Sequence, residues 1–218
     1  MGTITPLRFS GTYEDEQGRE EISWLLQPSA HSWRKPETFE LHTVIRGVEF
    51  HGSDFEGLAA LDRDAAAAAG LDPDLCDCRL SGGLPVQVTA TGGQRIVLAE
   101  FSCELRNGTA EIVRVAIEID GTVHQGTGEY FEDCLDKVQR TFPPGTFLMS
   151  CHTCQWSGPV LHYQNVLGVR CCRDAGRQHL DAPPNGRHWR VPVAEWVPDT
   201  HLCARYARRT PTTPTTPT

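Results

Sequence analysis

Apolar and polar residues alternate along much of the chain between residues 7 and 127, a period typical of β-strands with one buried face. Short alternating segments occupy residues 7–9, 22–26, 39–45 and 48–50. The clearest pattern lies in residues 84–127, where Gly92-Gly93, Asn107-Gly108 and Asp120-Gly121 separate three runs. Such dipeptides favour tight hairpins because they accept positive φ at little cost. The pattern predicts an antiparallel meander with Cys103 on its buried face.

Two segments are predicted to be helical. The first begins at Ser53, where Ser53 and Glu56 match a capping box, and continues through an alanine-rich run to Gly70. The second runs from about Tyr130 to Arg140 and ends before a Pro-Pro-Gly sequence. Its apolar residues recur at spacings of three and four and should face the core: Phe131, Cys134, Leu135 and Val138.

These elements predict an α+β protein: an antiparallel β-meander or sheet with two helices and a C-terminal Cys-rich zinc-binding lobe. We expect the sheet body in residues 1–146 and the Cys-rich lobe in residues 147–209. The low-complexity Thr/Pro tail, residues 210–218, cannot bury apolar surface and is expected to be disordered.

Charge and composition argue against some classes of function. The net charge of −8 argues against binding to nucleic acid through its phosphates. The sequence shows neither a signal peptide nor an apolar stretch long enough for a membrane span. Nine cysteines, an odd number, are better explained as thiols and metal ligands than as a disulfide framework. We therefore expect a cytoplasmic protein.

The main candidate site is a four-cysteine zinc centre. Cys151 and Cys154 follow an apolar strand and form a Cys-x-x-Cys pair, which lets two sulfurs reach one ion from a single turn. Cys171 and Cys203 are the predicted closing ligands. Several residues near these cysteines are alternatives to one of them: Cys172, His152, His162 and His201. Redox chemistry is disfavoured because the sequence after Cys154 is a poor helix start, whereas redox pairs typically open a helix.

Cys76-Asp77-Cys78 forms a second cluster. On a strand both sulfurs would point the same way, giving half a metal site or a reactive dithiol, but two small apolar residues under a loop are the favoured explanation because no closing spacing follows. Two hypotheses for function follow. The chain is a zinc-stabilised cytoplasmic binding or accessory protein of unknown ligand, or a small metal- or thiol-dependent enzyme using the Cys-rich lobe or Cys76 and Cys78. The expected partner is a protein or small molecule, not nucleic acid or a membrane.

The chain also resembles an uncharacterised bacterial domain-of-unknown-function family over residues 8–209. The resemblance rests on motifs around residues 46–55, 75–78, 128–133, 148–154, 168–174 and 200–206. It implies that Cys151, Cys154, Cys171 and Cys203 are the ligands and that Cys172 stands where the family usually has phenylalanine. The family usually has Ser-Asp-Tyr-Ser-Pro after the second cysteine, and this chain departs from it with Trp156-Ser157-Gly158-Pro159. No activity follows from the resemblance.

Overall fold

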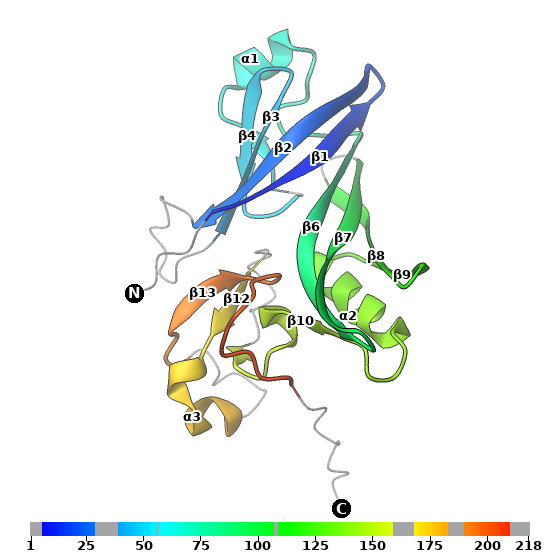
Figure 1. Cartoon of the computed structure of the whole chain (residues 1–218). Helices are drawn as coiled ribbons and strands as arrows, with labels where there is room; N and C mark the ends of the chain where they lie inside the picture. The colour runs from blue at the N-terminus through cyan, green and yellow to red at the C-terminus, as the bar shows by residue number, and fades with distance from the viewer. Residues whose placement is uncertain are drawn as a thin grey trace, which may run out of the picture.

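The structure is a computed structural model, and it describes residues 6–28, 39–55, 57–106, 109–158, 168–182 and 190–209. Its main feature is a ten-stranded sheet with the order β5-β4-β3-β2-β1-β6-β7-β8-β9, to which β10 adds beside β6 (Figure 1). All of its strand pairs are antiparallel. The strands are β1 Leu7–Asp15, β2 Gly18–Pro28, β3 Phe39–Ile45, β4 Val48–Gly52, β5 Ala59–Ala60, β6 Cys78–Ala90, β7 Gly93–Arg106, β8 Thr109–Ile119, β9 Thr122–Gly128 and β10 Phe147–Met149.

The predicted meander is confirmed by β6 to β9. Ala90 pairs with Gly93 across the first hairpin, and Ile119 pairs with Thr122 across the turn at Asp120-Gly121. Both residues of that turn have positive φ, 52° and 79°, as its sequence favours. Cys103 lies fully buried on the inner face of β7, so packing explains this thiol. The second turn, at residues 107–108, lies outside the described residues.

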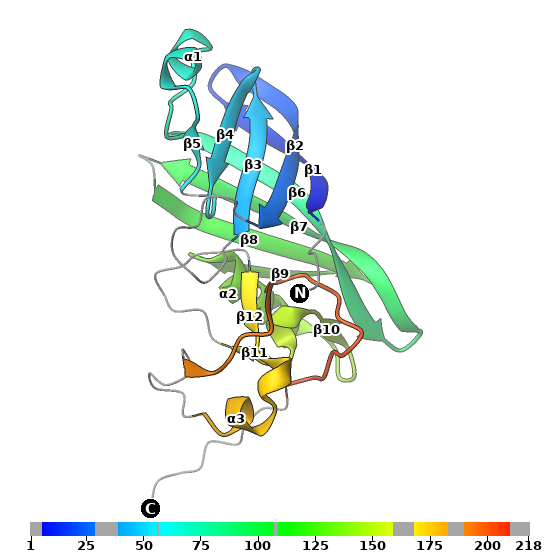
Figure 2. The same ribbon diagram turned by 90° about the vertical axis from the view of Figure 1, so that its left-hand side faces the viewer.

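The sheet changes direction where β1 meets β6. These two strands pair only from Gly11 opposite Gly82 to Glu14 opposite Arg79 and diverge beyond Gly11. A Cβ at Gly11 would overlap the main-chain oxygen of Ser81, which accepts a 2.9 Å hydrogen bond from the Trp24 indole. Close contact between the two backbones therefore requires glycine here. Figures 1 and 2 show the β1–β4 half and the β6–β9 half at a wide angle to one another.

The first predicted helix starts in the wrong place. Ala59–Ala60 forms β5, which pairs with β4, and α1 begins only afterwards, covering Arg63–Ala68. Its N-cap is Asp62, whose carboxylate accepts a 2.9 Å hydrogen bond from the Ala65 amide. Ser53 caps no helix, and Glu56 lies outside the described residues. The predicted end is correct, because Gly70 follows with φ 68°.

The second helix is confirmed as α2, Phe131–Thr141, with Tyr130 at its N-cap. The four apolar residues predicted to face the core are all buried there: Phe131, Cys134, Leu135 and Val138. This face packs on β9 and β8. Burial raises the pKa of the Cys134 thiol to about 11, as expected for a protonated core cysteine.

The described segments from Phe147 onward are called the C-terminal lobe here; in Figure 1 their small sheet lies below β1–β4 and to one side of β10 and α2. It contains a three-stranded antiparallel sheet, β11-β12-β13, with bounds Ser157–Gly158, Gly168–Cys171 and Glu195–Pro198. Its helices are short: η1 Cys151–Thr153, η2 Arg173–Ala175 and α3 Arg177–Leu180. β10 at the start of the lobe pairs with β6 of the body, and Trp196 of β13 lies in the body's hydrophobic core.

The fold is thus α+β and mainly antiparallel β, as predicted in outline. The tail of residues 210–218 lies outside the described residues. Among the described residues, no helix is long and apolar enough to cross a membrane.

Candidate metal centre

Cys151 and Cys154 lie at either end of one 3₁₀ turn. Cys151 opens η1, and the Cys154 amide donates a 3.3 Å hydrogen bond back to the Cys151 carbonyl. Only 3% and 4% of the two residues is exposed. The turn places both thiols within the lobe, where little solvent reaches them.

Cys171 and Cys203 reach the same region from distant parts of the chain. Cys171 ends β12, opposite Ser157 of β11 and Glu195 of β13, and is 5% exposed. Cys203 follows β13, is half-buried and packs against a small apolar cluster that contains Cys151 and Cys171. The small sheet therefore brings these two cysteines to the Cys-x-x-Cys turn.

Electrostatic interactions reveal the proximity of the four thiols. Burial raises the pKa of Cys151, and negative charge on Cys154, Cys171 and Cys203 would raise it further. The sulfur of Cys172 would lie 3.5 Å from a Cβ added at Gly158, and Cys171, not Cys172, belongs to the apolar cluster that contains Cys151. Of the adjacent pair, Cys171 is thus the thiol near Cys151.

Hydrogen-bond donors approach two of these sulfurs. The Arg205 amide donates to Cys203 Sγ at 3.4 Å. Burial raises the pKa of Cys171, while the main-chain amide of Arg173 and its guanidinium, 3.3 Å from the sulfur, act in the opposite direction. Arg173 also pairs with Glu195. In both cases the amide two residues after the cysteine donates to its sulfur.

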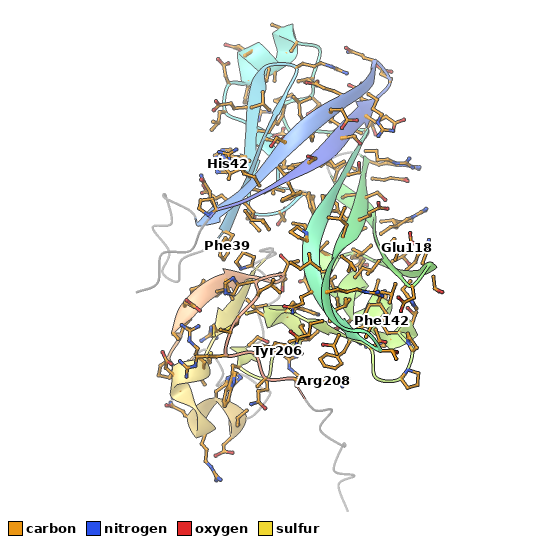
Figure 3. All side chains as sticks on the ribbon, viewed as in Figure 1. Phe39, His42, Glu118, Phe142, Tyr206 and Arg208 are labelled. Atoms are coloured by element: carbon orange, nitrogen blue, oxygen red, sulfur yellow. The ribbon has the colours of Figure 1, made fainter. Side chains whose placement is uncertain are left out.

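The chain after Cys203 folds back over the turn. Arg208 forms a β-bridge with Cys154, and the Arg209 amide donates a 3.0 Å hydrogen bond to the Thr153 carbonyl. The Arg208 guanidinium lies 4.2 Å from the centre of the Phe147 ring. Figure 3 shows Tyr206 and Arg208 along this returning segment. The segment thereby covers the Cys-x-x-Cys turn.

The histidine alternatives are differently placed. His152 Nε2 lies 2.9 Å from Asp136 and Nδ1 lies 3.5 Å from Asp199, so both ring nitrogens face carboxylates. Burial lowers the pKa of His152, but these two carboxylates outweigh it and raise the value to about 9. Burial lowers the pKa of His201. His162 lies outside the described residues. No sequence pattern indicated the link that His152 makes between α2 and the lobe.

The sulfurs are neighbours without being in coordination geometry. Within the described residues, no group of three or more His, Cys, Asp or Glu side chains is arranged so that it could hold a metal ion. A shared ion would require the thiols to turn toward a common centre.

Cys76 and Cys78 differ from the predicted strand pair. Cys78 begins β6, but Asp77 has φ 51° and Leu75 has φ 47°, so Cys76 lies outside the strand. The expectation that both sulfurs share one strand face is therefore wrong. Burial and then Asp15 raise the pKa of Cys78 to about 12, and burial with Asp72 raises that of Cys76. Both thiols are protonated at neutral pH and are therefore weak nucleophiles.

A groove of about 650 Å³ lies where β1 and β6 diverge. Its lining combines apolar side chains with side chains of both charges, among them Phe9, Leu98, Arg8, Arg19, Glu21 and Glu100. Its volume is in the range of small-molecule sites. The sequence pattern did not indicate this groove, because pairing stops at a point that only the sheet geometry defines.

These elements define a mainly antiparallel α+β protein with a Cys-rich C-terminal lobe. The chain belongs to a family of unknown function, DUF6304, whose model matches residues 7–157. This confirms the expected resemblance to an uncharacterised family. The matched range includes Cys151 and Cys154 and ends before Cys171 and Cys203. No curated protein and no solved structure matches the chain.

Proposed function

We propose that the chain is a zinc-stabilised binding or accessory protein in which Cys151, Cys154, Cys171 and Cys203 hold one structural Zn²⁺. The observation that carries the proposal is the approach of four thiols from three separate segments, with amide donors directed at two of the sulfurs. Four thiolates are a common ligand set of closed structural zinc sites. Amide hydrogen bonds to coordinated sulfur are typical supporting contacts of such ligands.

Zinc would alter the ionisation of this cluster. Without a cation, burial and mutual repulsion keep the Cys151 thiol protonated at neutral pH. A divalent ion reverses that preference, because a coordinating thiol loses its proton. Zinc uptake should therefore release protons and draw the sulfurs to about 2.3 Å from the ion.

The ion would add a further link between parts of the lobe that main-chain hydrogen bonds already connect. The Cys-x-x-Cys turn, the end of β12 and the segment after β13 would share one centre. Because an unfolded chain offers no preformed site, the binding free energy would contribute directly to folding of the lobe.

The groove at the β1–β6 divergence is the proposed surface for a ligand. A lining of apolar side chains together with charged side chains suits an extended peptide or a small amphipathic molecule. The alternative of a thiol-dependent enzyme gains no support from Cys76 and Cys78, whose raised pKa values weaken them as nucleophiles.

The first test is elemental analysis of the full chain, purified without a histidine tag or added metal. We expect one zinc per chain. Cys151→Ser and Cys154→Ser should each lose zinc and lower the melting temperature, whereas Cys172→Ser, which changes a buried thiol next to Cys171, should keep it. A metal-free wild-type protein that also takes up no added Zn²⁺, or full zinc retention in both serine variants, would refute the proposal.

A further inference from the structure

The groove where β1 and β6 diverge is bordered by two strand edges that lack a neighbour. β1 pairs with β6 only from Gly11 onward, and β6 gains its next partner at Gln87, where it meets β10. Within the described residues, no strand pairs with this side of β1 before Gly11, or with this side of β6 from Gly83 to Val86. Figure 1 shows the two strands spreading apart below their contact. A strand edge of this kind presents unpaired main-chain N–H and C=O groups.

The β1 edge of the groove offers both donors and acceptors. The main-chain oxygen of Ser10 faces β6, because a Cβ added at Gly82 would lie 3.1 Å from it. In an antiparallel strand the N–H and C=O of one residue point to the same side, and successive residues alternate between the two sides. Arg8 therefore directs its main-chain groups the same way as Ser10. These groups point away from β2, so the N–H and C=O of both residues enter the groove.

The β6 edge offers mainly acceptors. The main-chain oxygen of Ser81 faces β1, because a Cβ added at Gly11 would overlap it. By the same alternation, the main-chain groups of Gly83 and Pro85 point into the groove. Proline has no N–H, and within sheets it is confined to positions such as an edge that needs no donor. This edge thus supplies the N–H and C=O of Gly83 and the C=O of Pro85.

Apolar side chains line the floor and one rim of the groove. The Phe9 and Phe101 rings meet edge to face with their centres 6.0 Å apart, and both residues contribute to the lining. Leu98 lies opposite Pro85 in the register of β6 and β7 and is 56% exposed. An apolar side chain of a ligand would therefore meet aromatic rings below and Leu98 at the rim.

Two charged side chains of opposite sign stand on the two sides of the groove. Arg8 of β1 and Glu100 of β7 both line it and are exposed, and neither forms an ion pair within the part of the chain that the structure describes. Glu100 lies opposite Gly83. The register of β1 and β6, if continued, would bring Ser10 level with Gly83 and Arg8 two residues further along. A strand lying in the groove would thus meet the two charges with outward side chains two residues apart.

On the basis of the proposed role of this groove as the ligand surface, we infer that its ligand is an extended peptide segment of a partner protein, inserted as a strand between β1 and β6. Main-chain groups on both edges would then gain partners, and such hydrogen bonds supply affinity when a peptide adds to a sheet. The expected peptide alternates apolar side chains, which face Phe9 and Phe101, with polar ones that face outward. An acidic outward side chain would lie beside Arg8 and a basic one beside Glu100.

The main chain distinguishes a peptide from a small amphipathic molecule. The free groups recur along both edges at the two-residue spacing of a strand, a pattern that another strand matches along its length. A small amphipathic molecule would cover the apolar floor and leave most of these groups without a partner. Because Pro85 lacks an N–H, we expect the larger share of the hydrogen bonds to form with β1.

The test begins with selection of a phage-displayed library of random linear peptides on the full-length protein loaded with Zn²⁺. An enriched peptide is then synthesised, and its affinity is measured by fluorescence anisotropy. We expect enriched sequences to alternate apolar and polar residues and to carry an acidic and a basic residue two positions apart. Hydrogen exchange followed by NMR should show fast exchange at the amides of Arg8, Ser10 and Gly83 in the free protein and slow exchange when the peptide is bound.

Variants and modified peptides test the two kinds of contact. Ser10→Pro removes a donor from the groove and no hydrogen bond to β2, so it should weaken binding about three- to tenfold, whereas Ser10→Ala keeps the N–H and should bind as the wild type does. Arg8→Glu should weaken binding about fivefold or more. Arg177→Glu makes the same charge change on an exposed residue of α3 and should leave binding unchanged. Methylation of the peptide nitrogens that face β1 should weaken binding at least as much as Ser10→Pro, and it leaves the protein unaltered.

Three results would overturn the inference: no enriched peptide, an affinity that main-chain methylation leaves unchanged at every position, or exchange protection confined to residues outside the groove. A dimer in light scattering that Ser10→Pro dissociates would assign the groove to a second copy of this chain instead. Zinc content measured on the same sample separates this outcome from that of the zinc proposal. Zinc-loaded protein that enriches no peptide contradicts only the peptide ligand, whereas metal-free protein that binds the peptide contradicts only the zinc centre.

Discussion

Replacing His152 with alanine should destabilise the protein through the carboxylate that it leaves behind. The His152 imidazole lies between Asp136 of α2 and Asp199 after β13. The Asp199 side chain is 3% exposed and the Asp136 side chain 54% exposed. Loss of the imidazole therefore leaves the buried Asp199 carboxylate without a cationic partner, whereas the Asp136 carboxylate stays in contact with water.

The magnitude follows from these two environments. Breaking a buried ion pair costs about 3–5 kcal/mol, whereas an exposed pair contributes at most about 1 kcal/mol. A stranded carboxylate can also bind a proton, which for an ordinary aspartic acid costs about 4 kcal/mol at pH 7 and about 1.5 kcal/mol at pH 5. The destabilisation of His152→Ala is thus expected to be about 3–4 kcal/mol at pH 7 and to fall to about 2–2.5 kcal/mol at pH 5, because the wild type, whose His152 pKa is raised to about 9, itself gains about 1 kcal/mol over that range.

The assay is urea denaturation followed by tryptophan fluorescence at both pH values, with zinc held constant. Asp136→Asn is the matched control and should cost no more than about 1 kcal/mol. Adding Asp199→Asn to His152→Ala should restore part of the stability, because a neutral amide needs no cationic partner. An equal penalty at pH 5 and pH 7 would refute the electrostatic reasoning and indicate lost packing. A penalty below about 1 kcal/mol at pH 7 would show that Asp199 needs no charged partner.

Three further predictions concern stability. Burial raises the pKa of Glu132 from 4.5 to about 7, so the free energy of unfolding should decline as the pH rises from 4.5 through 7. In denaturant titrations over this pH range, Glu132→Gln should remove about 1–3 kcal/mol of that decline. Gly11→Ala should cost about 3 kcal/mol or more by thermal unfolding, because its Cβ would overlap β6, whereas Gly92→Ala, with open space around it, should stay within about 0.5 kcal/mol. Asp62→Ala should lower the free energy of unfolding by about 1 kcal/mol because it removes the observed N-cap, and Ser53→Ala should lower it less. A larger loss for Ser53→Ala than for Asp62→Ala in calorimetry would contradict the observed start of α1.

Local signals in the sequence were enough for the meander and for α2. Strict alternation fixes which side chains face inward, since a one-residue shift would bury every polar neighbour. Asp120-Gly121 then selects the turn between β8 and β9. In α2 the spacing of Phe131, Cys134, Leu135 and Val138 leaves only one face to bury.

Tertiary contacts determined the start of α1 and the cysteine that lies near Cys151, which local propensity did not specify. An alanine-rich run is compatible with a helix at any starting point, and α1 begins at Arg63 because Ala59–Ala60 pairs with β4 instead. Likewise, spacing alone does not distinguish Cys171 from Cys172, and the pairing of β12 with β11 and β13 brings Cys171 toward Cys151.

The same distinction separates the Cys-x-x-Cys pair from the histidine pair of β3 and β4. Cys151 and Cys154 lie one turn apart, so the sequence alone brings their sulfurs together and suggests an ion. His42 and His51 are brought together by the register of β3 and β4. The spacing of residues along the chain determines short-range geometry, whereas contacts between strands depend on hydrogen bonds that form only when the whole sheet assembles.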